Sequence, residues 1–103
     1  MTTSYEIPLS PDPQRFRISL KGVYYWITLV WNGASNTWMI DIANAQQVKM
    51  ISSIPLVANV NLLEQYGYFD IGGELWAVTE GDLTAPPTKD NMGIKGHLYF
   101  IVR

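Results

Sequence analysis

The side chains that could do chemistry in this chain are a single histidine, His97, and scattered carboxylates. The sequence contains no cysteine, which excludes disulfides, thiolate metal sites and cysteine nucleophiles. A serine–histidine–aspartate triad would have to use His97. That histidine stands immediately before the apolar run 98–102, a position that favours structural duty at the start of a strand. We therefore expect no catalytic residue and no enzymatic activity.

Carboxylates near the chain's long glycine- and proline-containing segment are the other chemical candidates. Oxygen-rich loops can bind calcium, yet no calcium-loop spacing is present in the set Glu80, Asp82, Asp90 and Asn91. One histidine with dispersed acids also lacks the ligand spacing of a zinc site. Paired carboxylates such as Asp70 and Glu74 could suggest glycoside hydrolysis, but sequence does not set their separation. We expect neither a metal nor a cofactor.

Arginine and aromatic side chains give a stronger signal. In a predicted hairpin, Tyr24 and Trp26 share a face with Arg15 and Arg17. Tryptophan, tyrosine and arginine are the usual anchors of protein interfaces, and Arg17 over Trp26 would contribute about 0.5–1 kcal/mol as a cation–π contact. Three interpretations stay open: a second layer covers this face, a partner protein binds it, or sugars stack on it.

The elements that must position these side chains begin with that hairpin. Phe16, Ile18 and Leu20 alternate with polar residues, the period-2 pattern of a half-buried strand. Lys21-Gly22 is a plausible two-residue turn. It predicts the apolar pairs Leu20–Val23, Ile18–Tyr25 and Phe16–Ile27. A slip of one residue would mix the two faces, so the pattern fixes the register.

Most of the remaining chain also has the pattern of strands, predicted at 38–43, 48–53, 74–80 and 96–103. A short helix is predicted from Asn61, a capping residue, to Tyr66, with Gly67 ending it. The last strand is apolar on both sides, so it should lie centrally or have both faces covered. The sequence predicts one all-β domain over 1–103, a small sandwich or barrel of antiparallel strands with one short helix.

The segment 81–96 is long for a connection in a compact domain, and such segments often contact something. It carries the run Asp90, Asn91 and Met92. We therefore add these three residues to the hairpin residues as candidates for a partner interface.

Composition narrows the class of partner. Hydrophobic residues make up 48% of the chain and charged ones only 16%, where about 25% is typical. Some aromatic surface should therefore be hidden in a partner. The net charge of −2 argues against nucleic acid. The start of the chain lacks signal-peptide regions, and the longest apolar run, 23–31, is far short of a membrane span. We expect folding in a cytoplasm, with no membrane partner.

Stretches spread in order over nearly the whole chain resemble one family. They are residues 5–9, 13–16, 29–32, 38–42, 54–57, 61–66, 71–75, 90–93 and 97–100. Together they resemble the baseplate plug proteins of contractile-tailed phages and related prophages. The resemblance implies a virion structural part that packs against hub and spike proteins near the tail axis. It also implies a homo-oligomer in the assembled baseplate, built in the host cytoplasm, and it transfers no catalytic residue.

A second function class stays open beside this one. The same aromatic composition suits a small ligand- or carbohydrate-binding β module that stacks sugars on Trp26 or Trp38. Specific binding on a glycan array, abolished by one tryptophan-to-alanine change, would favour that class.

Overall fold

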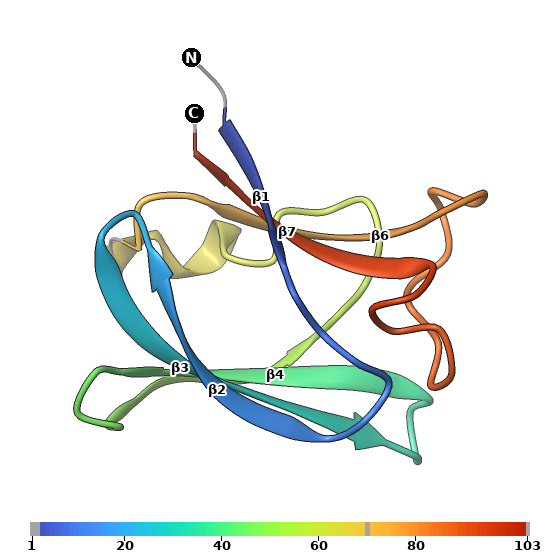
Figure 1. Cartoon of the computed structure of the whole chain (residues 1–103), viewed down its shortest axis with the longest axis horizontal. Coiled ribbons are helices and arrows are strands. Elements are labelled where there is room, and N and C mark those ends of the chain that lie inside the picture. Colours follow the sequence, from blue (N-terminus) through green and yellow to red (C-terminus); the bar gives the residue numbers. More distant parts are fainter. Residues whose placement is uncertain (1–2, 70, 103) are drawn as a thin grey trace.

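The computed structural model describes residues 3–69 and 71–102, which form two antiparallel sheets packed face to face (Figure 1). One sheet has the strand order β1-β7-β6 and the other β2-β3-β4-β5. The strands are β1 (Thr3–Ile7), β2 (Gln14–Leu20), β3 (Val23–Asn32), β4 (Thr37–Asn44), β5 (Lys49–Pro55), β6 (Glu74–Thr79) and β7 (Gly96–Val102). The predicted all-β fold is confirmed, and its form is the sandwich.

The β2–β3 hairpin has the register that the apolar pattern predicts. Leu20 lies opposite Val23, and Phe16 lies opposite Ile27. The turn residues Lys21 and Gly22 have φ values of 54° and 83°. Positive φ at both central positions is the type I′ geometry, whose twist matches that of the flanking strands. The turn and the burial pattern therefore select the same register.

Strand β7 lies at the centre of its sheet, between β1 and β6. A central position explains why its sequence is apolar on both sides. Its edge partner β1 was not predicted from the sequence. Of the β1 residues, only Ile7 is buried, while Ser4, Tyr5 and Glu6 are exposed, so the strand has no alternating pattern. Backbone pairing with β7, from Thr3 opposite Val102 to Ile7 opposite Leu98, forms it instead.

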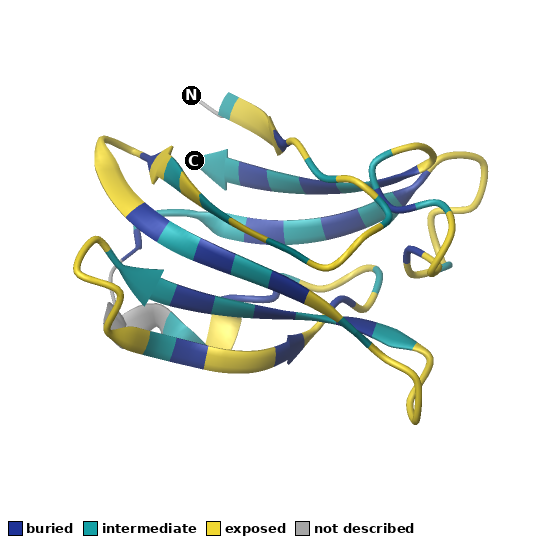
Figure 2. Ribbon diagram, turned by 60° about the horizontal axis from the view of Figure 1, so that its bottom comes forward, coloured by how far each residue is buried: buried dark blue, intermediate teal, exposed yellow. Residues whose placement is uncertain are grey.

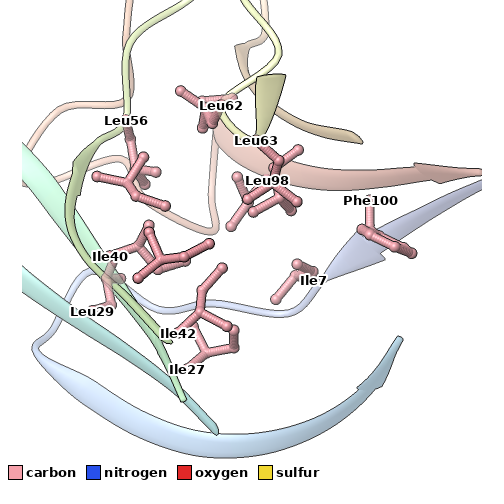
Figure 3. Close-up of a cluster of buried hydrophobic side chains, with 14 of the residues drawn as sticks. Ile7, Ile27, Leu29, Ile40, Ile42, Leu56, Leu62, Leu63, Leu98 and Phe100 are labelled. Carbon is pink, nitrogen blue, oxygen red and sulfur yellow. The ribbon is translucent and has the colours of Figure 1, made fainter. Parts of the chain in front are cut away.

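The core lies between the inner faces of the two sheets. Buried and partly exposed residues alternate along β3, β4, β6 and β7 (Figure 2). Figure 3 shows side chains of both sheets converging with the connection that follows β5; those labelled are Ile7, Ile27, Leu29, Ile40, Ile42, Leu56, Leu62, Leu63, Leu98 and Phe100. Burial of such aliphatic side chains supplies most of the stability of a domain this small.

The predicted short helix is a 3₁₀ helix, η1 (Glu64–Phe69), that begins later than expected and continues past Gly67. Asn61 does not directly precede η1; its Oδ1 accepts the backbone N–H of Leu63 at 3.0 Å, in the turn that leads into the helix. The same oxygen accepts the N–H of Leu75 in β6 at 3.2 Å. Asn61 thus ties η1 to the sheet. No α-helix forms among the described residues, and no helix there is long and apolar enough to cross a membrane.

The long segment between β6 and β7 folds back on its own domain at one end of the sandwich (Figure 1). The backbone oxygen of Asn91 accepts the N–H groups of Ile94, Lys95 and Gly96 at 2.8, 3.0 and 2.9 Å. Trp38 Nε1 donates to the carbonyl of Thr88 at 2.8 Å. The sequence predicted that this long segment contacts something, and the structure shows that it contacts its own domain.

Candidate functional site

The outer face of the β2–β3 hairpin carries two stacked arginine–aromatic pairs, which we call the arginine face: Arg15, Arg17, Tyr24 and Trp26. The Arg15 guanidinium lies 5.1 Å from the centre of the Trp26 ring. That of Arg17 lies 4.7 Å from the Tyr24 ring. The four residues predicted to share a face therefore do share it.

The pairing within this face differs from the sequence prediction. Arg17 is directly opposite Trp26 in the strand register, and we expected those two to stack. Instead, each arginine extends diagonally toward an aromatic ring nearer the turn. Diagonal neighbours in antiparallel strands are within reach of long side chains. The predicted stacking of Arg17 on Trp26 is therefore wrong, because Arg17 stacks on Tyr24 instead. The strand register from which it was predicted is confirmed.

The arginine face is open and partly fixed in place. Tyr24 is 51% exposed, so no second layer within the described chain covers the hairpin's outer side. Arg15 also donates a hydrogen bond to Gln47 Oε1 on the β4–β5 connection. Side chains held in position lose less conformational entropy when a partner binds. The face therefore has the composition and order of a protein-contact surface.

The loop candidates lie elsewhere. Asp90 is exposed and lines a separate hollow of about 540 Å³ together with Trp31 and Lys89. Asn91 holds the loop together, since its Oδ1 accepts the N–H of Thr88 at 2.7 Å. Met92 is fully buried in the core. A side chain without exposed surface cannot touch a partner, so Met92 is not part of the interface that we propose.

Trp38, one of the two residues considered for stacking sugars, is also buried. It is 1% exposed, and its ring packs edge-on against Trp31 at a centroid distance of 5.3 Å. Its N–H group is already bonded to Thr88. The expectation that Trp38 binds a ligand is therefore wrong. Trp26 is the remaining tryptophan of that pair, and Arg15 lies over its ring.

His97 lies on the outer side of the other sheet, between two carboxylates. Its Nδ1 is 2.7 Å from Glu6 Oε2, and its Nε2 is 2.5 Å from Glu80 Oε2. Bonding both carboxylates through N–H donors requires the doubly protonated ring. The hydrogen bond to Glu80 is the main cause that raises the pKa of His97 above 6.5; burial opposes it, and Glu6 adds to it.

This arrangement links three segments and leaves His97 no free ring nitrogen to act as a base. Glu6 belongs to β1, and Glu80 directly follows β6. The carboxylates bond different edges of one ring, so they cannot share an ion with it. Across residues 3–69 and 71–102, no three histidine, aspartate or glutamate side chains are placed to hold a metal. This cluster could not be predicted from local sequence patterns, because Glu6 and His97 are 91 residues apart.

We expect the stability of the protein to fall as pH rises above about 6.5. Since the pKa of His97 is raised in the folded state, its contribution is full below the unfolded value of about 6.5 and is lost as pH rises through the folded pKa. No cysteine and no second histidine titrates in this range. Urea denaturation at several pH values measures the slope. In a His97→Gln control the slope should disappear; equal slopes in both proteins would contradict the assignment.

The fold and its surfaces define a class of protein before any comparison is made. The fold is a small all-β sandwich, and it presents an ordered, open surface of stacked arginine and aromatic side chains. Its histidine is occupied by carboxylates on both sides.

Comparison with protein families then identifies the particular group. The chain belongs to the family described as "Cyanophage baseplate Pam3 plug gp18", whose model matches residues 4–103. No curated protein matches the chain. The resemblance to phage baseplate plug proteins is thus confirmed. Membership makes the protein a viral structural component of the phage tail baseplate.

Proposed function

We propose that this plug protein packs against the central hub and spike proteins near the tail axis, in several copies, and that the arginine face is one of its contact surfaces. The observation that carries the proposal is the pair of ordered arginine–aromatic stacks on an open sheet face. Such anchors dominate binding energy at protein interfaces. An isolated soluble domain has no evident need to hold them in place.

Composition and size support the same proposal. A domain of 103 residues with 16% charged side chains covers itself poorly with polar groups, and burial in a large assembly removes that exposed apolar surface from water. A mildly acidic protein also does not retain passing DNA, which is bound through clustered lysine and arginine. On this proposal the protein is made in the host cytoplasm and remains in the virion tail.

The test is a pull-down of tagged protein from cells that produce the phage, with mass spectrometry of the retained proteins. We expect tail hub and spike proteins to be recovered and to stay bound at about 1 M salt, because charged groups buried in an interface with aromatic anchors are screened much less than exposed ones. The control is the same bait in cells without phage genes. Recovery of neither protein from a lysate with assembled tails and folded bait would overturn the proposal.

A further inference from the structure

The outer face of the β1-β7-β6 sheet is a second candidate surface, and its chemistry is the converse of that of the arginine face. A hollow of about 350 Å³ opens there, lined by Ser4, Trp76, Val78, Tyr99 and Ile101. Three glutamates lie on the same side of the sheet or at its end: Glu6, Glu74 and Glu80. We call this surface the glutamate face.

Cross-strand register explains how the glutamate face forms. Trp76 in β6 lies opposite Tyr99 in β7, and Glu74 lies opposite Ile101. Trp76 Nε1 donates to Glu74 Oε1 at 2.7 Å, which orients the indole at the edge of the hollow. The negative field of Glu6 and Glu80 also contributes, after burial, to the raised pKa of Tyr99. The face is therefore apolar at its centre and acidic at its margin.

The two faces have opposite charge. The outer side of the larger sheet carries Arg15, Arg17 and Lys49 with one carboxylate, Asp41, a net charge of about +2. Among the described residues, the glutamate face has three carboxylates, of which Glu74 is bonded by Trp76, and the protonated His97; these charges sum to about −2. The net charge of −2 for the whole chain does not reveal that the positive and negative charges lie on different faces. Opposed charge patterns of this kind steer association and fix its orientation.

The two faces are complementary in form as well. Tyr24 is 51% exposed and projects from the arginine face with Arg17 over its ring. The glutamate face offers an apolar hollow between aromatic side chains. A projecting tyrosine entering such a hollow would place the arginines beside the surrounding carboxylates. An aromatic anchor in an apolar pocket with charged groups at the margin is the usual anatomy of a binding hot spot.

From this complementarity we infer that the arginine face of one copy docks on the glutamate face of a second copy of the same chain. This inference rests on the proposed function in one respect. The proposed function assigns the arginine face to contacts within the baseplate, and the inference names a second copy of the chain as the partner of that face. The two faces belong to opposite sheets of one sandwich, so each copy can join two neighbours. Such head-to-tail contacts form a ring if the rotation closes and a filament if it does not.

The test uses two variants that each disable one face. Arg17→Ala/Tyr24→Ala removes the projecting pair, and Val78→Lys places a cation in the hollow. All three positions are on outer faces and partly or largely exposed, so circular dichroism should show folded proteins. Wild type should self-associate at about 100 μM in sedimentation velocity. Each variant alone should lose at least about tenfold in association constant, as expected for hot-spot residues.

Mixing the two variants distinguishes head-to-tail docking from other arrangements. The first variant keeps its glutamate face and the second its arginine face, so an equimolar mixture should form a discrete 1:1 dimer that cannot grow further. A wild type that is monomeric at 1 mM, or a mixture without dimer, would overturn the inference. Oligomers that persist in a solution of either variant alone would also overturn the inference.

The pull-down separates this inference from the proposed function. If hub protein is recovered but the mixed dimer does not form, the copy-to-copy docking fails while the baseplate role stands. If Arg17→Ala/Tyr24→Ala loses hub protein and the mixture stays monomeric, the arginine face meets the hub, which overturns the inference. If the mixed dimer forms but no hub or spike protein is recovered, the docking stands and the hub contact fails.

Discussion

Phe100→Ala should lower the free energy of unfolding by about 3–5 kcal/mol and remove most of the soluble protein, because the change leaves a phenyl-sized cavity in the core. Phe100 is fully buried in the central strand β7. It lies opposite Tyr5 on one side and Leu75 on the other. Domains of this size are stable by only about 5–15 kcal/mol, so the loss takes a large share of the total.

Relaxation cannot easily close that cavity. The ring of Phe100 fills the space beside Gly73, where a Cβ would lie only 2.5 Å from the Phe100 Cζ atom. The glycine has no side chain that could move into the vacated volume. The cost should therefore lie toward the upper part of the range that such truncations show.

Tyr24→Ala is the matched control for this prediction. It also deletes an aromatic ring from a strand, but on the open arginine face rather than in the core. We expect a loss below about 1 kcal/mol, since surface substitutions rarely cost more. Soluble expression and urea denaturation of both variants give the comparison. Normal solubility and a small loss for Phe100→Ala would show that β7 does not supply the core.

The fold could be predicted wherever burial alternates along a strand. Phe16, Ile18 and Leu20 define their hairpin's register without help from other elements. The same reasoning failed for β1, whose formation depends on backbone pairing with β7, 91 or more residues away for every pair. It also predicted a short helix over Asn61–Tyr66, whereas the structure has a 3₁₀ helix over Glu64–Phe69. Local sequence patterns predict local structure, but they do not predict pairing between strands that are far apart in the sequence.

The candidate site shows the same division. The four residues of the arginine face are neighbours in one hairpin, so sequence reasoning placed them together. The glutamate face combines residues from β1, β6 and β7 with Glu80, which directly follows β6, and the cluster of His97 with Glu6 and Glu80 joins β1 and β7 to that end of β6. Alternation along 74–79 and 96–102 indicates which side chains share a face, but it does not indicate that the face stays uncovered. That information comes only from the layer arrangement.

Gly93→Ala should cost about 3 kcal/mol or more, the second large effect. Gly93 has a φ of +82°, and a Cβ there would lie 1.9 Å from the carbonyl oxygen of Leu9 and 2.6 Å from its carbon. These are backbone atoms, which cannot rotate away as a side chain does. Left-handed backbone alone costs an alanine about 1–2 kcal/mol, and separating the two chain segments adds a packing loss of roughly 1–3 kcal/mol.

Moving the Gly93 segment away from the Leu9 segment would disturb the core as well as the loop. Gly93 follows Met92, which is fully buried, and its N–H donates to the carbonyl of Gly96 at 2.6 Å, at the start of β7. Moving Gly93 away from Leu9 would draw Met92 outward. It would also strain the bond between Thr88 and Trp38. A change in tryptophan fluorescence of the folded variant should therefore accompany the loss in stability measured with urea.

Gly81→Ala isolates the contribution of the contact. Gly81 has a similar φ of +86°, and a Cβ there would meet nothing within 4 Å. It should therefore show the backbone strain alone, about 1–2 kcal/mol, with unchanged fluorescence. The difference between the two variants measures how firmly the long loop is held against the segment after β1. Equal losses would mean that the loop can withdraw from Leu9 at no cost, and that its burial of Met92 adds little to the stability of the plug.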